Sequence, residues 1–177
     1  MVKPDGATGT LDAAREIAAA VPDPELPMMT LADLGILRRV TAEDGRVVVT
    51  ITPTYAGCPA ISVIAQDLRS RLARAGFADA IVRTELAPPW SSDQITPEGR
   101  RKLRAAGIAP PGPRPGTGLK PGAPVPLTLT SSPGAPVPCP RCGSLYTERT
   151  AAYGPTACTA LFRCATCREP FEHVKAV

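Results

Sequence analysis

The sequence predicts an α+β protein made of two small domains, and three observations support this prediction. First, residues 10–108 alternate between helical and strand-like hydrophobic patterns in the order helix, hairpin, helix, strand, helix. Second, Pro and Gly occupy half of residues 109–138, which is typical of an extended linker. Third, residues 139–177 contain two Cys-x-x-Cys pairs, which are typical of a metal-bound β-ribbon.

Three amphipathic segments of the first domain are expected to be helices. The first starts near residue 10 or 12 and ends before Pro22, with an apolar side formed by Leu11, Ala14, Ala18 and Val21. The second ends at Gly76, and its apolar stripe consists of Ile61, Ile64, Leu68, Leu72 and Ala75. The third begins near Thr96, with Pro97 at a position that suits the first helical turn.

Strand patterns lie between these helices. Two β-branched runs flank Asp44-Gly45, a pair that favours the tight turn of a hairpin. A third strand is expected in residues 78–86, "ADAIVRTEL". Together these segments give the core of a small mixed domain.

Cys58 stands alone where the second strand of the hairpin meets the following helix. Pro59 suits the start of that helix, so Cys58 is expected at or near its N-cap. The positive end of a helix favours a thiolate, which would make Cys58 reactive. A small buried cysteine at a turn is the alternative, and Asp23 and Glu25 are by themselves compatible with ordinary turn carboxylates.

The tail cysteines have the spacing of a four-ligand metal site. Cys139 and Cys142 form one pair, Cys164 and Cys167 form the second, and 21 residues separate the pairs. Four thiolates hold zinc tetrahedrally at about 2.3 Å, so a structural zinc site is the first interpretation. An iron-sulfur cluster also takes four cysteine ligands, and a redox dithiol is a third alternative.

Two further tail residues are expected to lie outside this site. Cys158 is six residues before Cys164, about 20 Å along a straight strand, whereas sulfurs that share one zinc lie about 4 Å apart. Cys158 is therefore interpreted as a core cysteine, or as a thiol that meets a partner or an incoming metal. His173 is expected to be a solvated tail residue, with replacement of a metal ligand as the alternative.

Charge and composition argue against several functional classes. Residues 1–108 carry 13 basic and 13 acidic side chains, so the net charge of +4 comes from the linker and the tail and gives little support for specific nucleic-acid binding. With one histidine and no nucleotide-binding loop, the chain lacks the usual hydrolytic residues, so we expect no enzyme. Because the sequence starts without the apolar run of a signal peptide and shows no membrane span, we expect a cytoplasmic protein.

Several motifs together resemble known families. "DPELP", "LADLGI" and "VVVTITPTYAGCPAI" resemble the SufT-type metal-sulfur cluster assembly domain, which is known for an acidic Asp-Pro-Glu segment and one reactive cysteine. Asp23, Glu25 and Cys58 occupy the matching positions. "LAPPWSSDQITPEGRRKLRAAGIAPP" and the cysteine-rich tail resemble the PaaD family, the accessory proteins of the phenylacetyl-CoA epoxidase system, over nearly the whole chain.

The resemblance implies an accessory factor of aerobic phenylacetate degradation. Such a protein would support the iron or iron-sulfur centres of a multicomponent epoxidase, with the epoxidase as its client. Cys58 would be the metal-transfer thiol for transient iron or an iron-sulfur cluster, assisted by Asp23 and Glu25. The alternatives are a general iron-sulfur cluster assembly factor with other clients and a zinc-ribbon protein that binds nucleic acid.

Overall fold

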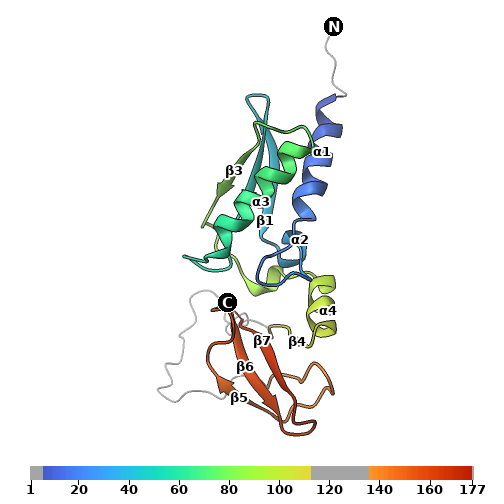
Figure 1. Cartoon of the computed structure of the whole chain (residues 1–177), viewed down its shortest axis with the longest axis vertical. Coiled ribbons are helices and arrows are strands. Elements are labelled where there is room, and N and C mark those ends of the chain that lie inside the picture. The colour runs from blue at the N-terminus through green and yellow to red at the C-terminus, as the bar shows by residue number, and fades with distance from the viewer. Residues whose placement is uncertain (1–5, 113–135, 177) are drawn as a thin grey trace, which may run out of the picture. The chain divides into compact units, whose positions relative to one another are not determined.

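The computed structural model describes residues 6–112 and 136–176, which form two compact units (Figure 1). The units comprise residues 1–100 and 101–177, and the division falls inside one helix, α4 (Pro97–Ala105). Most of the predicted linker, residues 113–135, lies outside the described residues. Within the described ranges, no helix has both the length and the apolar character needed to cross a bilayer.

A three-stranded sheet forms the centre of unit 1. Its strands are β1 (Leu37–Glu43), β2 (Arg46–Ile51) and β3 (Ile81–Thr84), in the order β1-β2-β3. The first two are antiparallel, and the positive φ angles of Asp44 and Gly45 in the connecting turn agree with the predicted hairpin. β3 runs parallel to β2, so the chain must cross over the sheet between these two strands.

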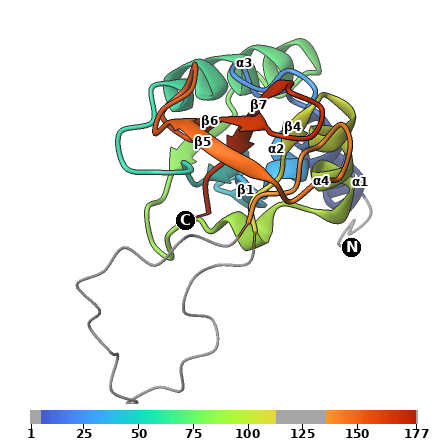
Figure 2. The same cartoon turned by 90° about the horizontal axis from the view of Figure 1, so that it is seen from below.

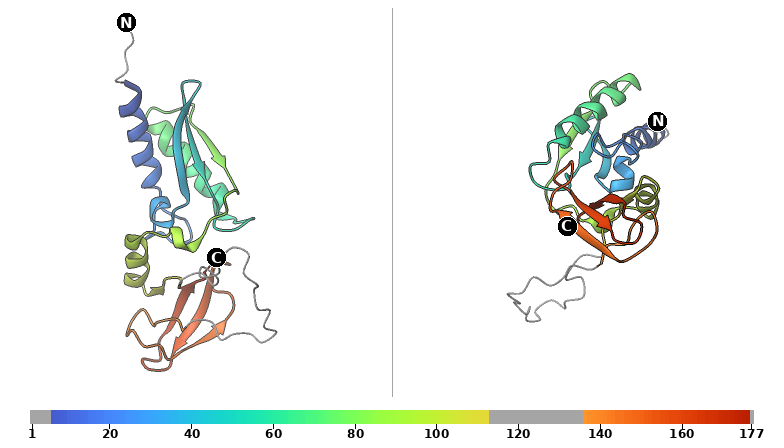
Figure 3. Two further views of the ribbon diagram at one scale, coloured as in Figure 1. Left: turned by 180° about the vertical axis from the view of Figure 1, so that it is seen from behind. Right: turned by 60° about the horizontal axis from the view of Figure 1, so that its bottom comes forward.

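Helix α3 (Ala60–Arg74) makes that crossover, and it contacts α1 (Gly6–Ala19). Helix α3 covers one face of the sheet. It lies in front of the strands in Figure 1 and behind them in Figure 3, where the molecule is seen from behind. The core of this layer includes Ala14 and Ala18 of α1, Val21, and Ile64, Leu68 and Leu72 of α3. These are apolar positions that the sequence periodicity predicted. Of the other predicted positions, Leu11 and Ile61 are partly exposed and Ala75 is exposed.

Two features of unit 1 differ from the sequence prediction. Helix α1 begins at Gly6 rather than near residue 10 or 12, because "GATG" adds a helical turn that has no apolar periodicity. A four-residue helix, α2 (Leu31–Leu34), was not predicted. A capping box holds it, in which the Thr30 side chain accepts from the Asp33 N–H and Asp33 accepts from the Thr30 N–H.

The segment after β3 folds back over α2 and β1. The indole of Trp90 is buried and donates its Nε1–H to the carbonyl oxygen of Leu34 at 2.8 Å. Arg38 donates to the carbonyl oxygen of Pro88, also at 2.8 Å. Next to these bonds, Gly35 lies so close to Gln94, in the short helix η1 (Ser92–Gln94), that an added Cβ would meet its atoms at 2.7 Å.

Unit 2 is built on a four-stranded sheet (Figure 2). Its strands in chain order are β4 (Ile108–Ala109), β5 (Thr147–Ala151), β6 (Thr159–Cys164) and β7 (Pro170–Val174). They are arranged in the order β4-β7-β6-β5. Ala109 and Val137, both within the range predicted as linker, belong to this unit, because Ala109 pairs with β7 and both residues are in its buried core.

We predict that Gly35→Ala destabilises unit 1 more than Gly45→Ala. Both glycines have a positive φ, which costs an alanine about 1–2 kcal/mol. Only at Gly35 does the new methyl group also meet Gln94, which adds about 1–3 kcal/mol of overpacking, whereas Gly45 has nothing within 4 Å. Denaturant titration of both variants checks this, and equal losses of stability would contradict the tight packing of residues 86–96 on α2.

Candidate functional site

The structure brings four tail cysteines together. The sulfur atoms of Cys139, Cys142, Cys164 and Cys167 all lie within 4.8 Å of one another. The Cys139 and Cys167 sulfurs are 3.7 Å apart, and the Cys142 and Cys164 sulfurs are 3.6 Å apart. Four metal–sulfur bonds of about 2.3 Å in a tetrahedron require sulfur separations of about 3.8 Å, so the four thiols fit one tetrahedral ion.

Two similar turns of the backbone position these thiols. In the first turn, the Cys139 N–H donates to Ser144 and the Gly143 N–H donates back to Cys139. In the second, the Cys164 N–H donates to Glu169 and the Cys167 N–H donates to the Cys164 sulfur. The residue that follows each pair has a left-handed conformation, with a φ of 75° at Gly143 and 64° at Arg168. Each pair thus closes a tight turn that directs two sulfurs to the same side.

The thiols strongly perturb one another. The backbone N–H of Cys167, with help from neighbouring donors, lowers the pKa of Cys164 to about 6. The backbone donor at Glu169 favours the Cys167 thiolate, but burial and the adjacent thiols raise the pKa of Cys167 to about 12. Without a cation the group therefore does not ionise completely near neutral pH, and metal binding must release protons.

The four-cysteine group is continuous with the small core of unit 2. Cys139 and Cys164 are buried among Ala109, Val137 and Phe171, whereas Cys142 is exposed. A cluster of buried residues this small provides little hydrophobic stabilisation. A metal at the four thiols would add stability, because it would connect the turns to the sheet. The sulfur spacing also favours a single ion over an iron-sulfur cluster, which places several iron and sulfide atoms between its ligands.

Cys158 and His173 lie outside the four-cysteine group. Cys158 precedes β6 and is partly exposed, with its sulfur 3.0 Å from the Thr156 hydroxyl oxygen. It is therefore absent from the metal group, as predicted, but it is not fully buried in a core. The prediction that His173 is a solvated tail residue is wrong, because His173 is half-buried in β7 with its ring 5.3 Å from that of Phe162. Burial lowers the pKa of His173 to about 4, so it is neutral near pH 7.

Cys58 lies in the segment between β2 and α3 and is 8% exposed. Its N–H donates to Tyr55 and its carbonyl oxygen accepts from Ile61, which closes a turn just before the helix. The N-cap is Pro59, so Cys58 is one residue before the cap. Within residues 6–112 and 136–176 no hydrogen bond reaches the Cys58 sulfur.

Asp23 and Glu25 have different environments. Asp23 is buried, and its Oδ1 accepts from the backbone N–H groups of Glu25 and Leu26 at 2.8 and 2.9 Å. It therefore holds the turn on which Glu25 lies. Burial, and then the nearby Asp23 charge, raise the pKa of Glu25 above its usual range.

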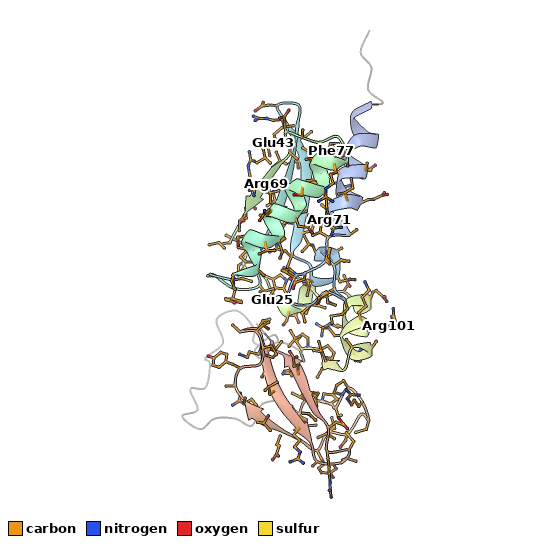
Figure 4. The ribbon with its side chains drawn as sticks, in the orientation of Figure 1. Glu25, Glu43, Arg69, Arg71, Phe77 and Arg101 are labelled. Atoms are coloured by element: carbon orange, nitrogen blue, oxygen red, sulfur yellow. The ribbon has the colours of Figure 1, made fainter. Side chains whose placement is uncertain are left out.

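The segments that carry these three residues lie at the same end of unit 1. The segment between α1 and α2 and the segment before α3 are both at the lower end of this unit in Figure 1, and Figure 3 shows the same arrangement from behind. Figure 4 labels Glu25 at this end. In the described part of the chain, however, Asp23, Glu25 and Cys58 do not form a group close enough to surround a metal ion by themselves.

Two protein families match separate parts of this chain. The family described as "Iron-sulfur cluster assembly protein" matches residues 12–80, and the family described as "PaaD zinc beta ribbon domain" matches residues 123–175. The crystal structure of a Domain of Unknown Function DUF59 from Bacillus anthracis matches with a TM-score of 0.50 and 27% identity. That match covers 54% of this chain and 92% of the other chain.

The particular family follows from a match over most of the chain. A protein of Escherichia coli (strain K12), named as one of the subunits of a "Putative 1,2-phenylacetyl-CoA epoxidase", is 38% identical over 161 residues, which cover 91% of this chain and 90% of the relative. The chain therefore belongs to the PaaD family. A "Fe-S protein maturation auxiliary factor" of Porphyromonas gingivalis (strain ATCC BAA-308 / W83) is 33% identical over 83 residues, 46% of this chain and 78% of that protein.

We predict that Cys164→Ser removes the metal from unit 2 and unfolds the ribbon of residues 139–176. Its free energy of folding should depend on the metal, because the ribbon has only a small core, and two of the four thiols are part of that core. Unit 1 has a separate core and should stay folded. Metal analysis together with backbone amide spectra checks this prediction, with Cys158→Ser as the matched control. Equal disturbance of both units would show that they do not fold independently.

Proposed function

We propose that this protein is an accessory factor that assembles or maintains the iron or iron-sulfur centres of a multicomponent epoxidase of the phenylacetyl-CoA type. The observation that carries this proposal is the presence of both family matches in one chain, with Cys58 inside the first. The name of the Escherichia coli relative supports an epoxidase as the client. In this role the protein performs no turnover of its own.

The four-cysteine group serves, in this proposal, as a structural zinc site. Zinc accepts four thiolates in tetrahedral geometry, and the sulfur separations of 3.6 and 3.7 Å suit a single ion. All four sulfurs are ligands, so none is available for exchange with a client. The thiol that transfers metal must therefore lie elsewhere, which favours Cys58.

Cys58 and Glu25 would bind the iron or cluster that is transferred. A thiolate is a soft ligand and a carboxylate is a hard one, so a mixed set binds iron without holding it as tightly as four thiolates. The raised pKa of Glu25 indicates that its anion is poorly stabilised until a cation arrives. Asp23 would act as a positioning residue, because its Oδ1 already accepts two backbone N–H groups.

A general iron-sulfur cluster assembly factor is the second candidate. The Porphyromonas gingivalis relative supports it, because that protein is named as a maturation factor without an epoxidase client. Specific nucleic-acid binding has less support. Arg149 is paired with Phe162 across the sheet, and Arg163 follows Phe162 in β6, so the two arginines lie on opposite faces.

We predict that Cys58→Ala leaves the fold and the tail metal intact but lowers the iron content and the activity of a co-expressed epoxidase. The substitution removes the transfer thiol and only a small side chain from a turn. Iron analysis of the purified epoxidase measures the effect, and Cys158→Ala serves as the matched cysteine control. Full iron content with Cys58→Ala, together with depletion by Cys158→Ala, would assign the transfer role to the tail.

We further predict that Glu25→Gln lowers iron delivery whereas Asp23→Asn preserves it. The first substitution removes the anionic ligand, whereas asparagine at position 23 retains an oxygen that accepts from the Glu25 and Leu26 N–H groups. Asp23→Ala should reduce both delivery and stability, because it leaves these two donors without an acceptor, at about 1–3 kcal/mol. The same co-expression assay, combined with thermal unfolding, separates these roles. Equal loss of delivery with Asp23→Asn and Glu25→Gln would make Asp23 a ligand instead.

A further inference from the structure

A groove of about 810 Å³ lies in unit 2. Its floor includes Ala160 and Phe162 of β6 and His173 of β7. Five prolines contribute to its walls, namely Pro110, Pro111, Pro136, Pro138 and Pro140. Prolines and aromatic rings give a rigid apolar surface that loses little conformational entropy when a ligand binds.

The strand residues that line the groove share one face of the sheet. Arg149 of β5 is paired with Phe162, and Ala160 of the same strand is paired with His173. Paired residues and residues two apart in a strand point to the same face. The His173 ring meets the Phe162 ring edge to face, with an interplanar angle of 79°. His173 is neutral near pH 7, so it contributes an aromatic wall rather than a charge.

Among the described residues that line the groove, every charged side chain is basic. Arg104, Arg149 and Lys175 contribute to its lining, and no Asp or Glu does. Lys175 already donates to the Ala157 carbonyl oxygen and lies 3.9 Å from the centre of the Tyr153 ring. Arg104 and Arg149 are exposed, and none of the ion pairs within residues 6–112 and 136–176 involves them.

The two arginines that line the groove belong to elements next to different edges of the sheet. Arg104 is in the last turn of α4, just before β4, and Arg149 is in β5. β4 and β5 are the two edge strands, three strand spacings apart, which corresponds to about 14 Å. An extended chain covers that distance in about four residues at about 3.3 Å per residue.

We propose that this groove binds an extended peptide segment of a protein partner, with apolar side chains in its centre and acidic side chains about four residues apart. The central side chains would lie against Phe162 and the prolines, and the acidic groups would pair with Arg104 and Arg149. Grooves lined by rigid aromatic side chains recognise extended peptides in this way. The inference goes beyond the proposed function, because it involves neither Cys58 nor any metal transfer.

A phosphorylated small molecule fits these observations less well. Phosphate sites bring several donors to one point, as an arginine fork or a helix N-terminus does. Here the two arginines belong to opposite edges, and the lysine is engaged with Ala157 and Tyr153. Separate charges on both sides of an apolar floor suit a linear ligand better than a single compact anion.

The test uses a library of random octapeptides displayed on phage and selected against the full-length, metal-loaded protein. The expected result is enrichment of peptides with two acidic residues three to five positions apart and apolar residues between them. The best selected peptide, made synthetically with a fluorescent label, then provides an affinity by fluorescence anisotropy. Replacing its acidic residues with lysine should abolish binding.

Matched variants locate the binding surface. Arg104→Gln and Arg149→Gln should each weaken binding by up to about fivefold, the loss expected for one exposed ion pair of about 1 kcal/mol. Arg163→Gln is the control, because it removes the same charge from the opposite face of β6. Amide shifts of β6 and β7 on peptide addition should include Phe162 and His173.

Three results would overturn the proposal. The first is a selection that yields no acidic consensus. The second is an equal loss of affinity with Arg163→Gln and Arg149→Gln, which would indicate general attraction by a basic protein. The third is that millimolar ATP displaces the peptide at physiological salt and that the nucleotide binds directly at Arg149. This result would assign the groove to a phosphorylated ligand.

Discussion

Four cysteine thiols held within 4.8 Å can be fully ionised only around a cation, and unit 2 depends on this constraint. The two turns that bring the thiols together are closed by a few backbone hydrogen bonds and carry a non-glycine residue, Arg168, in a left-handed conformation. The core beneath them is small. A bound ion would neutralise the thiolates and join the two turns to β6. It would thereby compensate for the left-handed Arg168 and for the small core. An ion bound there would also hold Cys139, which lies in the proline-rich segment 136–140 that lines the groove.

Unit 1 depends on a different constraint. Parallel strands β2 and β3 require a crossover, and α3 provides it. The connection from β2 into α3 carries Cys58, and the turn held by Asp23 carries Glu25 at the same end of the unit. The proposed soft thiol and hard carboxylate ligands therefore belong to segments at one end of the mixed layer. In the proposed division of roles, one unit exchanges metal and the other retains it.

Local signals explain which parts of the fold were predictable. Asp44-Gly45 predicted the hairpin, Pro97 the start of α4, and the Cys-x-x-Cys spacing the four-ligand group. These features depend on residues close in sequence. By contrast, α2 is a four-residue helix held by a capping box, which is too short to show a hydrophobic period. β4 has two residues and exists only because it pairs with β7, more than 60 positions later, and the same pairing places the half-buried His173 inside the sheet.

The candidate sites were predictable to different extents. Cysteine spacing identified the tail ligands, but no sequence signal distinguished the buried Asp23, which accepts two backbone N–H groups, from the partly exposed Glu25. The groove also could not have been predicted, because its residues come from α4, β5, β6, β7 and two proline segments that meet only in the folded unit. Arg104, Arg149 and Lys175 are far apart in the sequence but line the same groove.

The most direct test of this account is the metal and sulfide content of anaerobically purified protein, measured together with its visible spectrum. The account predicts a colourless protein with one tightly bound zinc per chain, retained when Cys58 is replaced by alanine. A brown protein with stoichiometric iron and sulfide that is lost with Cys142→Ser would contradict it, because the tail thiols would then carry the cluster themselves.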